Sequence, residues 1–274
     1  MSKRQPKKRF GQNFLQDQSI INAIVSHVKL KENERLIEIG PGRGALTQYL
    51  LQKSPRLDVI EIDRDLVDYL SRKFSEYPQL TIHSQDVLQF DFDKIVQPEE
   101  QAFVIGNLPY NISTELLFYL SALPYICNMV FMLQKEVVDR ICALPGTTNY
   151  SRLSVGLQHK YVCSHLLEVP KECFYPIPQV ESAVIKLRRR SEILPVNEKL
   201  FNQVVTTAFN QRRKCLRNSL ANLLDFTDKN VNAQNGSDPN LSDQISQYAS
   251  KRPQELSVAD FVNITNLIDV NRCD

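Results

Sequence analysis

The hydrophobic and polar positions in the first 190 residues alternate between short β-branched runs and longer stripes of helical period. Strands are predicted at 35–40, 58–63, 80–83, 101–106 and 126–133, with a late edge strand at 182–187. Helices are predicted at 17–28, 45–52 and 66–74, where apolar residues recur every three or four positions. Strands and helices alternating at this spacing indicate an α/β fold, with a parallel sheet covered on both faces.

Beyond Arg190 the strand signal ends and the pattern becomes helical, at 200–209, 216–224 and 258–267. A chain of 274 residues is long for one compact domain and short for two ordinary ones. We therefore expect a main α/β domain over residues 1–190 and a small all-helical domain over 191–274, with the boundary in the charged run before Pro195.

The composition excludes several classes of protein. Hydrophobic residues make up 42% and charged residues 23% of the chain, which is typical of globular proteins and not of disordered or collagen-like ones. No apolar run approaches the roughly 18 to 20 residues that cross a bilayer, so no membrane association is expected. The six cysteines form no C-x-x-C pair, which argues against a metal site or a disulfide framework. A cytoplasmic protein without a metal is the prediction.

Basic residues gather in two blocks although the net charge is only +2. The first ten residues hold five basic residues and no acid, and residues 186–217 hold nine basic residues against two acids. Two such blocks indicate a polyanion-binding protein, with a solvated charged surface as the alternative for each. The candidate RNA-binding residues are Lys7, Lys8, Arg9, Arg212, Arg213, Lys214 and Arg217.

The first predicted strand ends in a glycine-rich turn that begins at Gly40 and has the spacing G-x-G-x-G. This spacing differs from the dinucleotide fingerprint G-x-G-x-x-G, so a pyrophosphate is not indicated. The second strand ends at Glu61 or Asp63, and a carboxylate there can accept both ribose hydroxyls; we favour Glu61, with Asp63 as a helix cap. Asp86 follows the third strand and either accepts the adenine amine or caps a loop. Together these positions predict S-adenosylmethionine, because no P-loop for ATP is present.

The fourth strand ends in Asn107-Leu108-Pro109-Tyr110, and an Asn-x-Pro-aromatic run resembles the signature of methyltransferases that act on exocyclic base amines. Such an amine is a poor nucleophile because its lone pair is delocalised into the ring. The Asn107 side chain and the Leu108 carbonyl can accept both amine hydrogens, which favours a tetrahedral nitrogen. Pro109 stiffens the turn, and Tyr110 offers a stacking face. The alternative is an ordinary Asn-Pro loop with a surface tyrosine.

Longer motifs resemble one family, the small-subunit (16S) ribosomal RNA adenine N6,N6-dimethyltransferases. They lie at 10–15, 107–114, 132–140, 146–155, 174–183 and 211–220, and the similarity runs from about residue 8 to about residue 265. The resemblance implies a class I, Rossmann-like methyltransferase sheet followed by a small all-helical C-terminal domain that contacts RNA and ribosome. It also implies dimethylation of two adjacent adenines in the 3′-terminal hairpin of 16S rRNA.

The resemblance assigns roles to individual residues. It places Asn13 and Leu15 at the methionine portion of the cofactor, with Gly40, Glu61, Asp86 and Asn107 completing the pocket. Asn107, Leu108, Pro109 and Tyr110 form the turn that grips the amine. Phe174 supplies a second aromatic face against the flipped adenine, or is simply a core residue. The implied partner is the small ribosomal subunit, and a monomer is expected.

Four alternatives stay open from the sequence. The nearest is the large-subunit rRNA adenine methyltransferase of macrolide resistance, which shares the glycine turn and the Asn-x-Pro-Tyr turn. DNA adenine methylation requires a target-recognition insertion that is not visible. A nonenzymatic ribosome-assembly role is compatible with catalysis. A nicotinamide dehydrogenase is disfavoured by the glycine spacing.

Overall fold

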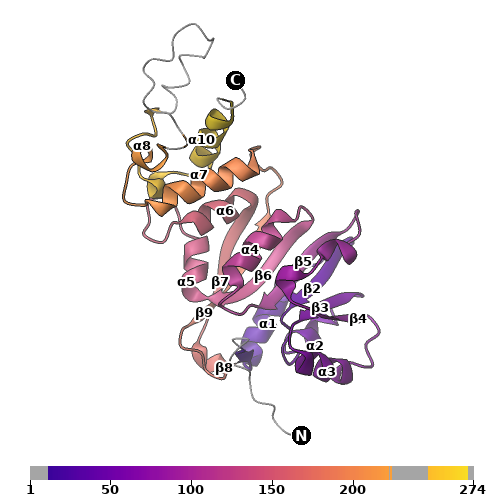
Figure 1. Ribbon diagram of the computed structural model, residues 1–274. Coiled ribbons are helices and arrows are strands. Elements are labelled where there is room, and N and C mark those ends of the chain that lie inside the picture. Colours follow the sequence, from indigo (N-terminus) through magenta and orange to yellow (C-terminus); the bar gives the residue numbers. More distant parts are fainter. Residues whose placement is uncertain (1–11, 222, 224–245, 271–274) are drawn as a thin grey trace. The chain divides into compact units, whose positions relative to one another are not determined.

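The computed structural model describes residues 12–221, 223 and 246–270 (Figure 1). Contacts divide these residues into two compact units. The first holds the described residues up to Asp139 together with Tyr161–Arg189, and the second holds Arg140–Lys160 and the described residues from Arg190 onward. The second unit therefore includes residues 140–160, which the sequence pattern alone placed in the first domain.

A seven-stranded sheet with the order β4-β3-β2-β5-β6-β9-β7 forms the first unit. The strands are β2 (Glu34–Ile39), β3 (Leu57–Glu61), β4 (Leu80–Ser84), β5 (Gln101–Asn107), β6 (Ile126–Gln134), β7 (Tyr161–Val169) and β9 (Ser182–Arg189). Strands β4, β3, β2, β5 and β6 pair in parallel, as the βαβ pattern predicts. The antiparallel strands β9 and β7 follow.

The expectation of an edge strand at 182–187 is wrong. Strand β9 pairs with β6 on one side and with β7 on the other, so β7 forms the edge. Strand β7 was not predicted, because its sequence mixes exposed polar residues such as Ser164 and His165 with only a few buried positions. Such a pattern carries little strand signal until a partner strand is known.

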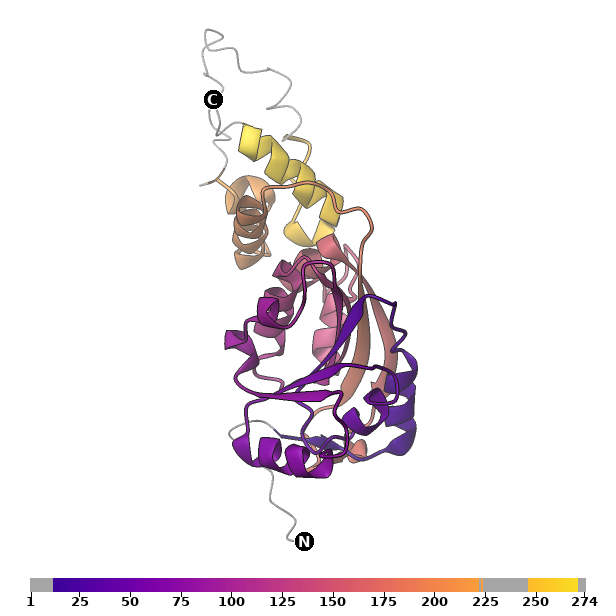
Figure 2. The ribbon, with the colours of Figure 1, turned by 90° about the vertical axis from the view of Figure 1, so that its right-hand side faces the viewer.

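Helices cover both faces of the sheet, with α1 (Gln18–Ser26) and α4 (Ser113–Ala122) on opposite sides (Figures 1 and 2). Helix α1 begins where Asp17 accepts hydrogen bonds from the backbone N–H groups of Ser19 and Ile20. Its apolar stripe packs in the same core as residues of α2 (Thr47–Leu50) and α3 (Arg64–Lys73). This arrangement leaves the carboxyl ends of the parallel strands for a ligand, as in other open α/β sheets.

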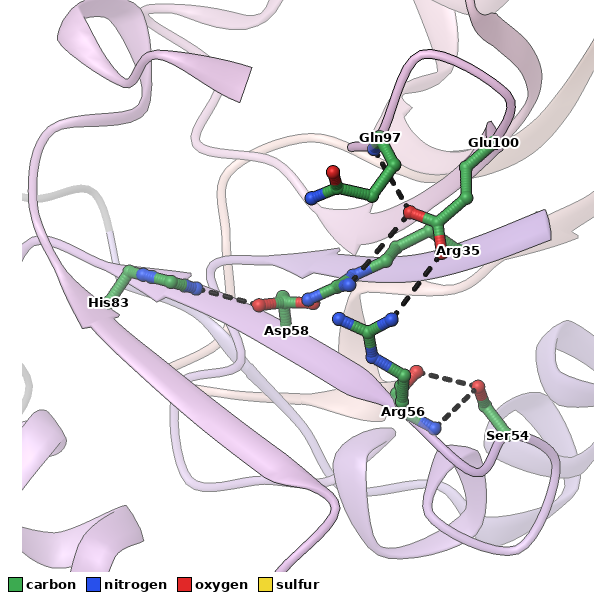
Figure 3. A network of polar contacts seen from close by, with 7 residues as sticks. All are labelled: Arg35, Ser54, Arg56, Asp58, His83, Gln97 and Glu100. Carbon is green, nitrogen blue, oxygen red and sulfur yellow. Dashed lines mark hydrogen bonds and ion pairs between the residues drawn. The ribbon is translucent and has the colours of Figure 1, made fainter. Parts of the chain in front are cut away.

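A polar network ties the strands β2, β3 and β4 together (Figure 3). Asp58 on β3 is 1% exposed and lies 2.7 Å from Nε of Arg35 on β2 and 2.8 Å from Nε2 of His83 on β4. Glu100 lies 3.9 Å from Nη1 of Arg35 and 3.5 Å from Nη1 of Arg56. Burial opposes ionisation of Asp58, but hydrogen bonds from His83 and Arg35 outweigh it and lower the pKa of Asp58. A paired, charged Asp58 therefore joins three strands.

A separate two-stranded ribbon pairs β1 (Phe14–Leu15) with β8 (Phe174–Tyr175). Phe14 lies opposite Tyr175, and Leu15 lies opposite Phe174. The paired residues are 161 and 159 positions apart in the sequence. Two-residue strands carry no periodicity, so no local pattern predicts them.

The second unit is helical and has its own core. Its helices are α6 (Arg152–Lys160), α7 (Glu198–Asn210), α8 (Leu216–Ser219) and α10 (Val258–Val270), while α5 (Lys135–Ile141) begins in the first unit and ends in the second. Of the short 3₁₀ turns, Pro253–Glu255 belongs to the second unit, and Val87–Gln89, Phe92–Lys94 and Lys171–Cys173 belong to the first. Tyr150 and Val155 are fully buried among side chains of α7 and α10, which explains why residues 140–160 belong here. Among the described residues, no helix combines the length and apolar character needed to cross a membrane.

Candidate functional site

A cavity of about 430 Å³ opens at the carboxyl ends of the parallel strands and beside the β1 segment. It is where most of the residues singled out from the sequence come together. The predicted residues that line it are Asn13, Leu15, Gly40, Glu61, Asp86, Asn107, Leu108, Pro109 and Tyr110. They come from five separate segments of the chain, so the fold and not local sequence makes the site.

The glycine turn after β2 forms one wall and needs its glycines for two physical reasons. Gly40, Gly42 and Gly44 have φ angles of 64°, 58° and 76°, which side-chain-bearing residues rarely adopt. A Cβ on Gly44 would lie 2.6 Å from the ring of Phe74 on the α3 side. The turn is therefore packed closely from outside while its backbone faces the cavity.

Glu61 at the end of β3 faces the cavity and is only 6% exposed. Its Oε2 accepts a hydrogen bond from the Gly42 N–H at 3.2 Å, and its Oε1 accepts one from the Asp63 N–H at 2.9 Å. Burial raises the pKa of Glu61, while these backbone bonds act in the opposite direction. Each carboxylate oxygen keeps a further lone pair for a ligand hydroxyl.

Asp63 is the helix cap that the sequence analysis favoured for it. It caps α3 by accepting from the Asp65 N–H at 3.1 Å, and its second oxygen accepts from Nε2 of Gln12 at 3.0 Å. Asp86 caps the turn at Val87–Gln89 by accepting from the Leu88 N–H at 3.0 Å, and it also lines the cavity. Its bond to the adenine amine stays a prediction.

The turn after β5 is held from three sides. Nδ2 of Asn107 donates to the backbone oxygen of Asn13 at 3.0 Å, which leaves Oδ1 as the acceptor that the amide offers to a ligand. The Leu108 N–H donates to the backbone oxygen of Met132 at 3.1 Å. Ser113 Oγ donates to the Tyr110 carbonyl at 3.2 Å. The turn is thus rigid before any substrate arrives.

Tyr110 is half-buried and its ring lines the cavity. Its hydroxyl lies 2.8 Å from Oγ of Ser182, a fully buried residue at the start of β9. Burial raises the pKa of Tyr110, so the hydroxyl is neutral. The hydrogen bond fixes the orientation of the ring and of the face it presents.

Phe174 differs from the other predicted catalytic and cofactor-binding residues because it lies outside the cavity lining. It is 3% exposed and packs in the main core with Leu15 and Val169. Successive residues of a strand point to opposite faces, and the residue that points outward from β8 is Tyr175, at 53% exposed. Phe174 therefore lies in the core of this structure, and its stacking against a flipped adenine stays a prediction.

Arg43 and Glu38 are two cavity residues that were not predicted from the sequence. Arg43 lies with its guanidinium 4.6 Å from the centre of the Phe14 ring, beside the glycine turn. Glu38 lines the cavity although it is 1% exposed, and it accepts a hydrogen bond from Oγ1 of Thr47 at 2.6 Å.

The buried carboxyl of Glu38 predicts a pH dependence of stability. Burial raises its pKa from the ordinary 4.5 to about 8, with the Thr47 hydrogen bond opposing and the charge of Glu61 adding to the shift. The folded protein therefore keeps a proton that the unfolded chain loses above pH 4.5. The contribution of Glu38 to the free energy of unfolding is complete below pH 4.5 and is lost as the pH rises toward 8. Glu38→Gln retains the acceptor for Thr47 and removes the titration.

We expect the stability of Glu38→Gln, relative to wild type, to improve by about 3 kcal/mol between pH 5 and pH 8. Urea denaturation at a series of pH values measures this difference directly. Parallel stability curves for the two proteins would show that Glu38 is ionised in the folded state.

The predicted RNA-binding residues divide into groups. Lys7, Lys8 and Arg9 lie outside the described residues. Within the second unit, Arg213, Lys214 and Arg217 are exposed, whereas Arg212 is half-buried. The Arg212 guanidinium donates to the backbone oxygen of Thr148 and to Oε1 of Gln254, so it connects three segments of this unit. Across the described part of the chain, no group of three or more His, Cys, Asp or Glu side chains is arranged to hold a metal ion.

Solved structures share this fold over most of their length. A dimethyladenosine transferase from Plasmodium falciparum superposes with a TM-score of 0.78 at 26% identity, covering 94% of this chain and 97% of that one. The 23S rRNA methyltransferase ErmE superposes with a TM-score of 0.69 at 23% identity, covering 94% and 100%. The second likeness concerns the fold alone.

Sequence comparisons identify the family. The "Ribosomal RNA small subunit methyltransferase A" of Saccharophagus degradans is 44% identical over 265 residues, covering 96% of this chain and 94% of the relative. The protein of the same name from Nitrosomonas europaea is 50% identical over 227 residues, covering 81% and 86%. The family described as ribosomal RNA adenine dimethylase matches residues 3–251. With its α/β sheet and its cavity at the strand ends, the chain is a methyltransferase that belongs to the ribosomal RNA adenine dimethylase family.

Proposed function

We propose that this protein dimethylates the exocyclic amines of two adjacent adenines in the 3′-terminal hairpin of small-subunit (16S) rRNA. The proposed methyl donor is S-adenosylmethionine, the partner is the small ribosomal subunit, and the protein acts in the cytoplasm as a monomer without a metal. The observation that carries the proposal is that one cavity joins the Glu61 and Asp86 carboxylates to the rigid turn Asn107–Tyr110.

The cavity suits an adenosine-bearing donor. Its volume of about 430 Å³ lies within the ordinary range of small-molecule sites. Glu61 has acceptor capacity for ribose hydroxyls, and Asp86 has it for the adenine amine. Asn13 and Leu15 close the cavity from the N-terminal side, where Asn107 holds the Asn13 carbonyl. When bound, the donor supplies an electrophilic methyl group.

The remaining chemistry belongs to the turn. Oδ1 of Asn107 and the Leu108 carbonyl accept the two amine hydrogens, which directs the nitrogen lone pair toward the methyl group. Tyr110 stacks on the extruded base in an orientation set by Ser182. No general base is needed, because the methylated amine becomes acidic enough to lose a proton to water.

The direct test is incubation of the purified protein with methyl-labelled S-adenosylmethionine and small subunits that lack the modification, followed by nucleoside analysis. We expect N6,N6-dimethyladenosine at two adjacent positions of 16S rRNA. Large subunits in a parallel reaction should stay unlabelled. Label on 23S rRNA alone would instead support the macrolide-resistance activity.

Replacing Glu61 tests the cofactor end of the cavity. Glu61→Ala removes charge-assisted bonds to the ribose, and we expect a loss of about 2 to 3 kcal/mol in S-adenosylmethionine affinity. Isothermal titration measures it. Glu61→Gln is informative as well, since its NH₂ group would face the N–H of Gly42 or Asp63. Unchanged affinity in both variants would exclude Glu61 from the site.

The exposed basic residues of the second unit test the RNA contact. Combined replacement of Arg213, Lys214 and Arg217 by alanine should weaken binding to small subunits and reduce the salt slope by about 2 to 3. Cofactor affinity should not change. Arg212→Ala is the contrasting variant, because its guanidinium bonds within the unit, so its main effect should be lower stability. A wild-type salt slope for the triple variant would identify these residues as solvated surface.

A further inference from the structure

The segment 175–181, here called the rim loop, connects β8 to β9 and exposes apolar side chains. Tyr175, Ile177 and Val180 are 53%, 61% and 42% exposed. Three large apolar side chains exposed within six residues are unusual for a surface that contacts only water. The cofactor chemistry described above uses none of them.

Both ends of the rim loop are attached to residues that line the cavity. Tyr175 lies opposite Phe14 in the β1–β8 ribbon, and Phe14 lines the cavity. Directly after the loop, Ser182 bonds to the hydroxyl of Tyr110, which lines it too. The loop therefore begins and ends beside residues that line the cavity.

Glu181, at the end of the rim loop, accepts two hydrogen bonds from backbone N–H groups. Its Oε2 accepts from the Lys171 N–H at 2.8 Å, and its backbone oxygen accepts from the Lys135 N–H at 3.0 Å. These bonds restrain the end of the loop that bears the exposed apolar side chains. A binding surface of this kind loses little conformational entropy when it is covered.

The chemistry of the loop favours a neutral flat ligand. Exposed carboxylates at Glu172 and Glu181 border it, which disfavours contact with phosphates. An exposed tyrosine ring can stack on any nucleobase, because every base has a π-face. In the proposed reaction two adjacent adenines are modified, so whenever one occupies the cavity the other lies one nucleotide away, near its rim.

We propose that Tyr175 stacks on the unpaired base next to the adenine in the cavity. This inference rests on the proposed function. It assigns the outward residue of β8 a role in holding the RNA strand, separate from the stacking of the target base on Tyr110.

A cycle of protein and RNA changes tests the assignment. Small subunits are assembled on 16S rRNA whose 3′ hairpin is a ligated synthetic RNA, either intact, abasic at the target adenine or abasic at its neighbour. Binding is measured without the methyl donor, so that affinity is read without turnover. The proteins are wild type, Tyr175→Ala, Tyr175→Phe and Tyr110→Ala, with Tyr77→Ala as a matched control for an exposed tyrosine (43% exposed).

We expect Tyr175→Ala and the abasic neighbour each to weaken binding at least about five-fold, and their combination to weaken it no further. Tyr175→Phe and Tyr77→Ala should bind as wild type does. The losses of binding free energy caused by Tyr175→Ala and by the abasic target should add. The losses caused by Tyr110→Ala and by the abasic target should not.

Unchanged binding by Tyr175→Ala would overturn the inference, and so would additive effects of Tyr175→Ala and the abasic neighbour. If Tyr175→Ala changes the sedimentation of the free protein relative to wild type, the loop is instead an interface between copies of the chain. Failure of the proposed function gives a different result, in which the wild type distinguishes none of the RNAs and no variant alters binding.

Discussion

Asn107→Ala is expected to lower the single-turnover methylation rate at least about 100-fold, or ~2.7 kcal/mol, while weakening RNA binding far less. The Asn107 amide is held by its bond to the Asn13 carbonyl, so Oδ1 is oriented before the substrate binds. In the proposed reaction, the bond from the target amine to Oδ1 strengthens as the nitrogen becomes tetrahedral. The contribution therefore belongs to the transition state more than to the ground state.

Rapid-quench kinetics under single-turnover conditions, together with a binding titration, separate the two effects. Asn22→Ala on α1 is a suitable control, because it removes an exposed amide outside the cavity. Tyr110→Phe should be mild, since it keeps the stacking face and loses only the hydrogen bond to Ser182. Near-normal turnover by folded Asn107→Ala would rule out this mechanism.

Gly106→Ala is expected to destabilise the fold by about 3 kcal/mol and to abolish most of the activity. A Cβ at this position would lie 2.3 Å from the backbone oxygen of Ile39, so β5 would have to move away from β2. A backbone atom cannot yield as a flexible side chain can. The displacement occurs one residue before Asn107 and would misplace the amide that we propose to bind the target amine.

Gly146→Ala provides the matched control. Its φ angle of 85° strains an alanine, but a Cβ there meets nothing within 4 Å, so the cost should be limited to about 1 to 2 kcal/mol. Urea denaturation of both variants measures the difference. Equal stabilities would mean that the β2–β5 spacing tolerates a methyl group.

Much of the candidate site was predictable because its residues follow strand ends. The glycine turn, Glu61 and Asn107 each terminate a buried β-branched run, and parallel strands bring their carboxyl ends to one edge of a sheet. The parallel part of the sheet followed from the same pattern. Glu38 was missed because a single carboxylate within a strand has no local signature that separates a cavity-lining group from an outward-facing one.

The features that the sequence did not predict share one cause, which is that they depend on contacts between distant segments. Strand β7 exists because β9 offers it an edge, and the β1–β8 ribbon exists because Leu15 meets Phe174. The burial of Phe174 also depends on that ribbon. The half-buried position of Arg212 depends on bonds from its guanidinium to Thr148 and Gln254.

The sequence by itself determined the class of fold, the glycine turn, the carboxylate after the second strand and the Asn-Leu-Pro-Tyr turn, because periodicity and backbone chemistry act within a few residues. Only the tertiary structure decided which aromatic side chain points outward at the rim, which arginine is engaged internally and which unit residues 140–160 join. These depend on the burial of apolar surface between segments far apart in the chain, and that burial is a property of the whole fold.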